Sequence, residues 1–192
     1  MKTLFRFVLT AVAGTLLGLA ATYFMLQGGP RFGRIEVGAW RVAPGHTSAE
    51  IDPYARAAFA RTGEVPLAHA EGLSFLARSD SDGHRLEPRC DYILSGHVPA
   101  SRYWSLTLVS PSGALVDNPA KRYGFTSAEI LRAADGSFEI IISGHARPGN
   151  WLPAATPQAF NIVLRLYDTL LDFGTSNLDK NVLPQIRQGA CE

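Results

Sequence analysis

The first hydrophobic pattern in the chain is a continuous apolar run. Phe7–Leu26 is an uncharged stretch of 20 residues that follows two basic residues, Lys2 and Arg6. As a helix, this run is long enough to cross a bilayer core of about 30 Å. A cleaved signal peptide is the alternative, because Gly-Leu-Ala at 18–20 offers a small-x-small cleavage site. Since a signal core usually has about 7–15 apolar residues, the length favours an uncleaved signal anchor.

A connector with a mixed pattern follows the glycines and proline at positions 28–30. We expect a strand at Ile35–Val42 and an amphipathic helix at Ile51–Arg61. Further on, Ser127 can cap a second short helix that ends at Ala133. Two short helices are too few to make the folded part of the chain mainly helical.

Beyond residue 67 the apolar residues recur with a period of two, which is the spacing of half-buried strands. Turn-forming sequences separate the alternating segments, among them Ser-Asp-Ser-Asp-Gly at 79–83. Many short strands with few helices between them predict a mainly β fold, an antiparallel β-sandwich or barrel. The expected strands are Leu73–Arg78, Tyr92–Gly96, Arg102–Val109, Phe138–Ser143 and Ala159–Tyr167.

Alternation also assigns each strand residue to a face of the sheet. In two of the expected strands one face is apolar and the other is half polar, so the second face either lines a groove or is solvated. The first face carries Trp104, Leu106, Leu108, Phe160, Ile162, Leu164 and Leu166, with Arg102 at its start, and the opposite positions are Tyr103, Ser105, Thr107, Val109, Asn161, Val163, Arg165 and Tyr167.

The charges exclude one class of partner. The 18 Lys and Arg residues are balanced by 17 Asp and Glu residues, and the two signs alternate along the chain. Binding to the phosphates of nucleic acid needs a concentrated basic patch. We therefore expect no nucleic-acid partner.

The two cysteines, Cys90 and Cys191, are far apart in the sequence. In an anchored domain outside the cytoplasm, two thiols tend to be oxidised to a disulfide. Closing a loop of this size stabilises the fold by about 4–5 kcal/mol, because it lowers the entropy of the unfolded chain. The alternative is two unrelated free thiols.

A series of short motifs runs through the expected strands and their loops. The motifs are Arg102-Tyr103-Trp104-Ser105-Leu106, Gly113, Asp135-Gly136-Ser137, Gly149-Asn150-Trp151-Leu152-Pro153, Phe160 and Leu164-Arg165-Leu166-Tyr167. Over roughly Leu67 to Asp168 this series resembles the bacterial domain of unknown function family 1214. The resemblance implies an all-β, jelly-roll-like domain of an envelope protein and no established activity. In many members this domain follows a larger domain of family 1254, whereas here we expect it alone behind a membrane anchor.

We divide the chain into three parts on this basis. Residues 1–28 are the expected transmembrane signal anchor, 29–66 the connector with its short helix, and 67–192 the β-sandwich domain. The anchor predicts a single-pass membrane protein. Together with the resemblance to a bacterial envelope family, it implies a location in the bacterial inner membrane, with the C-terminal domain in the periplasm.

Within the expected anchor, Gly14 and Gly18 form a Gly-x-x-x-Gly pair. Such a pair lets two membrane helices approach closely, which suggests a homodimer through the anchor. Glycine is also common in membrane helices that do not pair.

The loop before the last expected strand holds the main candidate binding site. Asn150 and Trp151 follow a Pro-Gly turn, and Arg165 and Tyr167 lie on the polar face of the strand that comes next. One interpretation is a rim that binds a glycan, a lipid or a protein, with the Trp ring as the contact. The other is structural: Trp151 covers the end of the sandwich, with its indole N–H bonded to the backbone.

Arg165 occupies the middle of a strand, where a covered charge needs a partner. Glu139 is the first candidate for this partner, and Asp91 is the second. If the sheet face is wet, the interaction is a solvated surface pair worth less than about 1 kcal/mol.

Two histidines follow strand ends in similar sequences, since Leu-Ser-Gly precedes His97 and Ile-Ser-Gly precedes His145. If the two strands are neighbours, these imidazoles could share a metal ion. Zinc needs three or four ligands, and no third ligand stands at a familiar spacing. The alternative is that both are ordinary loop residues.

The sequence has no Gly-x-Ser-x-Gly, phosphate-loop, dinucleotide, Cys-x-x-Cys or His-Glu-x-x-His motif. This absence favours a non-catalytic binding module, and we expect no cofactor. A catalytic site assembled from distant residues is recognised by geometry alone, so a hydrolase with a site near His97 and His145 is the alternative. A structural partner of another envelope protein is the second alternative.

Overall fold

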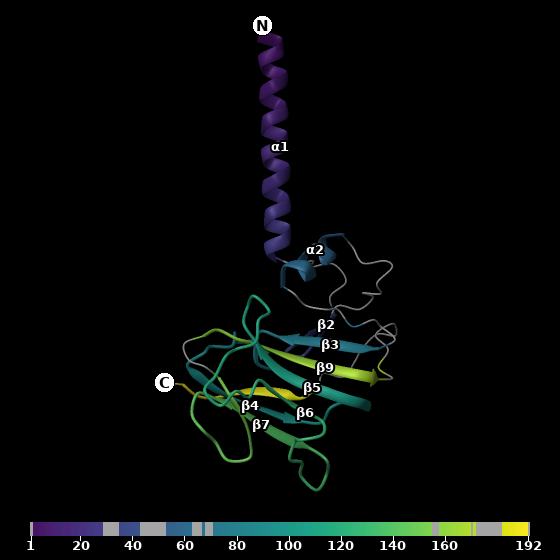
Figure 1. Cartoon of the computed structure of the whole chain (residues 1–192), viewed down its shortest axis with the longest axis vertical. Coiled ribbons are helices and arrows are strands. Elements are labelled where there is room, and N and C mark those ends of the chain that lie inside the picture. Colours follow the sequence, from purple (N-terminus) through teal and green to yellow (C-terminus); the bar gives the residue numbers. More distant parts are fainter. Residues whose placement is uncertain are drawn as a thin grey trace.

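The computed structural model describes residues 2–28, 35–42, 53–62, 67, 71–154, 158–169, 171 and 182–191. This part of the chain consists of a long N-terminal helix, a short second helix and a two-sheet β domain, whose first two strands precede the short helix (Figure 1). The expectation of a mainly β sandwich behind an apolar helix is confirmed.

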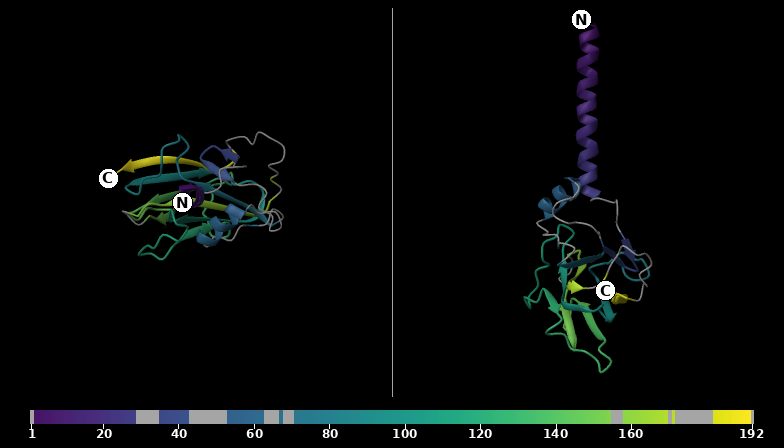
Figure 2. Two further views of the ribbon diagram at one scale, coloured as in Figure 1. Left: turned by 90° about the horizontal axis from the view of Figure 1, so that it is seen from above. Right: turned by 90° about the vertical axis from the view of Figure 1, so that its right-hand side faces the viewer.

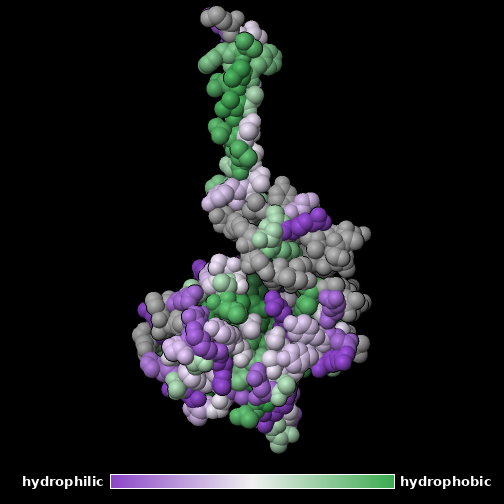
Figure 3. Space-filling model, in the orientation of Figure 1, coloured by the Kyte–Doolittle hydropathy of each residue, from purple (hydrophilic) through white to green (hydrophobic). Residues whose placement is uncertain are grey.

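Helix α1 comprises Lys2–Gly28 and contains the whole of the predicted apolar run. Its segment Lys2–Met25 is long and apolar enough to cross a membrane, as a signal sequence would also be. Figure 3 shows apolar side chains along this helix, and none of its residues from 2 to 24 is buried. The side view in Figure 2 shows α1 standing clear of the sandwich, with helix α2, Pro53–Thr62, beside its C-terminal end.

The strands form a sheet of six and a sheet of four. The six-stranded sheet has the order β1-β2-β3-β9-β5-β6, and the four-stranded sheet has the order β10-β4-β7-β8. Every neighbouring pair is antiparallel except β7 and β8, which are parallel. The strands are β1 Ile35–Val37, β2 Trp40–Val42, β3 Gly72–Ala77, β4 Cys90–Gly96, β5 Ser101–Val109, β6 Gly124–Thr126, β7 Phe138–Ser143, β8 Asn150–Pro153, β9 Asn161–Thr169 and β10 Gln185–Cys191.

The core lies between the two sheets. Trp104 of β5 stacks on Phe138 of β7 with ring centroids 5.1 Å apart, so β5 covers β7. The ring of Tyr92 on β4 meets that of Phe160, just before β9, edge to face. The apolar faces predicted from alternation are confirmed, because these positions are fully or almost fully buried: Trp104, Leu106, Leu108, Phe160, Ile162, Leu164 and Leu166.

The expected single strand at Ile35–Val42 is wrong, because the segment is a hairpin of β1 and β2. Gly38 has φ of 60° in its turn, a conformation that glycine adopts without steric cost. Trp40 is only 1% exposed, and its indole donates a hydrogen bond to the carbonyl of Pro184, 2.8 Å away. This hairpin extends the six-stranded sheet, so the sandwich begins well before the boundary expected at residue 67.

The expected helix at Ser127–Ala133 is also wrong. The segment makes a turn closed by the N–H of Glu129 on the carbonyl of Thr126, and Arg132 then forms an isolated bridge with Phe138. The backbone N–H of Leu131 donates a hydrogen bond to the side-chain oxygen of Asn150, and the carbonyl of Leu131 accepts one from the side-chain nitrogen. These hydrogen bonds to a distant residue replace the ones that a helix would have made within the segment.

Candidate functional site

Asn150 opens β8 at the edge of the four-stranded sheet and is 7% exposed. Its amide nitrogen donates to the carbonyls of Leu131 and Glu139, at 2.9 and 2.8 Å. Its amide oxygen accepts the N–H of Leu131 at 2.8 Å. With both amide protons used inside the fold, Asn150 joins the 131 loop to the edge strand and has no donor left for a ligand.

Trp151 is half-buried, and its indole N–H donates to the carbonyl of Ser143 at 3.0 Å. Its own carbonyl accepts a hydrogen bond from the guanidinium of Arg122 at 3.3 Å. The indole has one donor, and the backbone takes it. The structure therefore contains the hydrogen bond that the structural interpretation of Trp151 predicted.

Arg165 and Tyr167 lie on β9, in the middle of the six-stranded sheet. Their strand neighbours Leu164 and Leu166 are buried in the core, so Arg165 and Tyr167 face away from it. Trp151 pairs with Ile141 on the other sheet. The predicted rim of four residues is therefore split between two sheets, and the structure does not bring the two pairs together.

Neither predicted partner of Arg165 contacts it. Glu139 is exposed on β7, in the four-stranded sheet, where its neighbour on β4 is Ser95. The carboxylate of Asp91 binds the guanidinium of Arg147 at 2.6 Å. The prediction failed because strand order, which alternation does not encode, places Glu139 and Arg165 in different sheets. Among the described residues Arg165 forms no ion pair.

The outer face around Arg165 is organised in rows across three strands. Arg165 lies between Ser74 of β3 and Ser105 of β5. In the next row Tyr167 lies opposite Tyr103 of β5, with ring centroids 5.8 Å apart. We call these five residues, Ser74, Tyr103, Ser105, Arg165 and Tyr167, the outer-sheet patch.

The patch is accessible to solvent and has chemically distinct parts. Tyr103 is 39% exposed, and the other four residues are half-buried. On β3 the position opposite Tyr167 is Gly72, where a Cβ would lie 2.0 Å from the carbonyl oxygen of Leu166. Glycine is therefore required there, and no β3 side chain covers Tyr167 in its row. A guanidinium, four hydroxyls and two aromatic rings can together bind an anion and stack on a flat apolar surface.

Three members of the patch were not predicted as site residues. Alternation placed Tyr103 and Ser105 on one face, but it could not show that their strand pairs with β9. Ser74 comes from a strand that is about ninety residues earlier in the chain than β9. Only the pairing of β3, β9 and β5 assembles the patch.

The two histidines do not meet. Strands β4 and β7 are neighbours, as the shared-metal hypothesis required, but they run antiparallel, with Gly96 opposite Phe138 and Tyr92 opposite Ile142. His97 therefore follows one end of the pair and His145 follows the other. A metal shared between these residues is excluded.

The predicted disulfide between Cys90 and Cys191 is present. It joins the first residue of β4 to the last residue of β10, after an irregularity in the pairing between Gln188 and Cys191. The Gln188 amide lies 3.1 Å from one sulfur and 2.9 Å from the other. The bridge thus holds the C-terminal strand, whose side chains from Arg187 onward are exposed.

A shallow groove of about 560 Å³ lies on the four-stranded sheet. Its lining includes Ser95, Glu139 and Ile141 of the sheet, and Arg132, Pro148 and Asn150. Several of its polar groups are already bound within the fold, because Asn150 holds the 131 loop and the Arg132 guanidinium donates to the carbonyl of Gly136. The groove is a weaker candidate site than the outer-sheet patch.

Comparison with known proteins identifies a family but no activity. The family described as "Protein of unknown function (DUF1214)" matches residues 71–170. No curated protein matches this chain.

Two solved structures are similar to this chain. The VPA0106 protein from Vibrio parahaemolyticus is 20% identical with a TM-score of 0.54, and the match covers 74% of this chain and 36% of that protein. A putative uncharacterized protein from Burkholderia cenocepacia is 22% identical with a TM-score of 0.46, over 81% of this chain and 36% of the other. The chain thus spans about a third of the length of either protein, and the first similarity supports the fold alone. The family match runs through the sandwich from β3 to β9, and the chain belongs to the DUF1214 family of proteins of unknown function.

Proposed function

We propose that this protein is a membrane-anchored periplasmic domain that binds an acidic glycan, without catalysis, at the outer-sheet patch. The observation that carries the proposal is the placement of Arg165. Arg165 stands between two serines on the neighbouring strands, one row from a tyrosine pair, and has no carboxylate partner among the described residues.

Arg165 suits an anionic ligand. Arg165 is half-buried, and no described carboxylate pairs with it. A ligand carboxylate or phosphate therefore gains more there than at a fully exposed arginine. Arginine also binds such groups through two parallel hydrogen bonds, which fix the orientation of the ligand. Ser74 and Ser105 on either side offer hydroxyls to the remaining ligand oxygens.

Tyr103 and Tyr167 suit the sugar ring that would carry the anion. Each phenol has an apolar ring and a polar tip, so it can contact the ring face of a sugar while its hydroxyl bonds to sugar hydroxyls. An acidic glycan combines a stacking surface with a carboxylate, and the patch offers the complement of both.

The patch does not favour the hydrolase alternative. Its five residues include no histidine, aspartate or glutamate that could serve as a general base. The two histidines on which that alternative depended lie at opposite ends of a strand pair. A binding role needs only the donors and rings that the patch has.

Two features support the location. Helix α1 is long and apolar enough to anchor the domain in a membrane. The disulfide between Cys90 and Cys191 is the kind of bond that persists outside the reducing cytoplasm.

The test is a binding titration of the full chain in detergent micelles. The probes are an oligogalacturonate, which carries a carboxylate on each sugar, and a neutral glucose oligomer of equal length. We expect the acidic probe to bind and the neutral one to bind much more weakly. Arg165→Gln should weaken binding about tenfold or more, since a hydrogen bond to a charged group contributes about 1.5–3 kcal/mol.

The matched control is Arg187→Gln, since Arg187 is exposed on β10 of the other sheet. This variant loses the same charge and should bind the acidic probe like the wild type. Equal binding of both probes, equal binding by the two variants, or no binding of the acidic probe would each contradict the proposal.

A further inference from the structure

The turn between β3 and β4 contains a buried carboxylate oxygen without a hydrogen-bond donor. Asp80 is 1% exposed. Its Oδ1 accepts the backbone N–H groups of Asp82 and His84, at 3.0 and 2.8 Å. Its Oδ2 has no hydrogen-bond partner among the described residues. A buried carboxylate oxygen left in this state is costly, so a positively charged group in contact with it would stabilise the turn.

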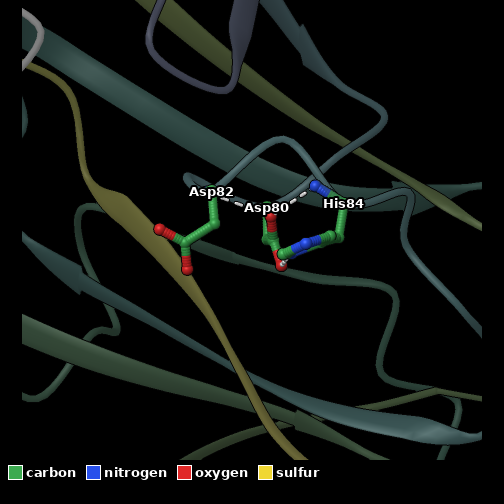
Figure 4. Close-up of side chains that lie close together, drawn as sticks. All are labelled: Asp80, Asp82 and His84. Carbon is green, nitrogen blue, oxygen red and sulfur yellow. Dashed lines mark hydrogen bonds and ion pairs between the residues drawn. The ribbon is translucent and has the colours of Figure 1, made fainter.

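Two further side chains of the same turn approach this oxygen. The Nδ1 atom of His84 lies 3.5 Å from Asp80 Oδ2. Asp80, Asp82 and His84 each have one carboxylate oxygen or imidazole nitrogen that could bind a metal ion, and these three atoms lie within 4.8 Å of one another. Figure 4 shows the side chains of Asp80 and His84 facing each other, with Asp82 beside them. Two ligands of a tetrahedral metal ion, each about 2.0–2.1 Å from it, stand about 3.4 Å apart, which is close to the separation of Oδ2 and Nδ1.

We propose that Asp80, Asp82 and His84 form a site for a divalent transition-metal ion of the Zn²⁺ type. The imidazole disfavours Ca²⁺ and Mg²⁺, which take oxygen ligands. Two carboxylates and one imidazole are a ligand set that zinc accepts, with water in the fourth position. The side chain of His84 is 72% exposed, so an ion can enter from solvent and keep that water.

Hydrogen bonds fix the backbone of the turn that carries the three ligands. The N–H of Asp80 donates to the carbonyl of His84 at 2.8 Å, which closes the turn. The N–H of Ser81 donates to the carbonyl of Ile186, and the N–H of Ile186 donates to the Ser81 hydroxyl. These two bonds fasten the turn to β10, so an ion here would add to the attachment of the C-terminal strand.

This site is separate from the outer-sheet patch and is tested independently of it. The full chain in detergent micelles is stripped of metal with a chelator, exchanged into buffer and titrated with Zn²⁺ in a calorimeter. We expect one equivalent of Zn²⁺ to bind. Asp82→Asn and His84→Gln should each lower the affinity by about tenfold or more, equivalent to about 1.4 kcal/mol or more. Both side chains are exposed, so these variants are expected to fold, whereas Asp80 also holds two backbone N–H groups.

The matched control is His97→Gln, because His97 is an exposed histidine outside the turn. It should bind Zn²⁺ as the wild type does. A second readout uses Co²⁺, whose visible absorption reports its ligands and should change in His84→Gln but not in His97→Gln. The proposal is overturned if no stoichiometric binding occurs, or if His84→Gln binds like the wild type. It is also overturned if His97→Gln loses binding to the same degree, since the histidines would then bind Zn²⁺ only as surface groups.

Discussion

The indole N–H of Trp151 donates to the carbonyl oxygen of Ser143 across the parallel strands β7 and β8, at 3.0 Å. The same carbonyl accepts the backbone N–H of Ala154, also at 3.0 Å. One acceptor at the end of β7 thus holds both the ring and the end of the following strand. The loop from His145 to Gly149 is closed by these bonds, which makes Trp151 part of the fold of this corner.

Replacing Trp151 should reduce stability and leave ligand binding intact. Trp151→Phe keeps a ring but loses the donor, so we expect it to lower the free energy of unfolding by about 1 kcal/mol. Trp151→Ala also loses packing and should cost about 2–4 kcal/mol, less than a fully buried tryptophan. Denaturant unfolding measures both variants. A Trp151→Ala protein that unfolds like the wild type but no longer binds oligogalacturonate would move the binding site to this loop.

Asn150→Ala should strongly lower the stability of the fold, although it removes only a small side-chain volume. It leaves the N–H and carbonyl of Leu131 and the carbonyl of Glu139 without their partner. We expect a loss of about 2–4 kcal/mol in thermal or denaturant unfolding. Asn161→Ala is the control, since among the described residues the Asn161 side chain makes no hydrogen bond. Equal losses in the two variants would show that the amide of Asn150 has no special role.

Removing the disulfide should destabilise the domain and release β10. The bridge joins two residues with a sequence separation of 101. Because it lowers the entropy of the unfolded chain, a bridge across such a loop stabilises the fold by about 4–5 kcal/mol. We expect the double variant Cys90→Ala, Cys191→Ala to unfold at a lower denaturant concentration. Its amides in β10 should also exchange with deuterium faster than those of β9. Unchanged exchange in β10 would mean that the hydrogen bonds to β4 are sufficient to hold the strand.

Tyr92 should make stability fall in alkaline solution. Burial raises the pKa of its hydroxyl above the ordinary value of 10.0, while the hydroxyl accepts the N–H of Glu87 at 2.7 Å. A raised pKa in the folded state contributes stability that is present below about pH 10 and is lost as the pH rises through the folded value. Tyr92→Phe should be less stable than the wild type at neutral pH by about 1 kcal/mol. The difference should shrink at high pH, and a constant difference would contradict this account.

Helix α1 should hold the chain in the membrane. The pair Leu16→Arg, Leu17→Arg places two charges near its centre, each costing about 2.5–3.5 kcal/mol of insertion free energy. We expect the wild type to stay in the membrane pellet after alkaline carbonate and the variant to be released. Mass spectrometry of the wild type should give the full chain. A mature protein that starts soon after residue 20 would instead identify α1 as a cleaved signal sequence.

The sequence by itself determined the features that depend on local pattern. Period-two alternation located β4, β5, β7 and β9 to within two residues and assigned the core faces of β5 and β9, because successive side chains of a strand point to opposite faces of the sheet. The apolar run predicted α1 for a similarly local reason. Two short strands, β6 and β8, were not predicted, because three or four residues carry too little alternation.

Tertiary structure decided which faces and ends come together. Pairing between strands distant in the chain placed Arg165 beside Ser74 and Ser105, and it kept Arg165 away from Glu139. The antiparallel direction of β4 and β7 separated His97 from His145. The side chain of Asn150 accepts the backbone N–H of Leu131, in a segment that was expected to be a helix. Each of these contacts depends on strand order and direction, which are set by packing across the whole sandwich and leave no local periodicity to read.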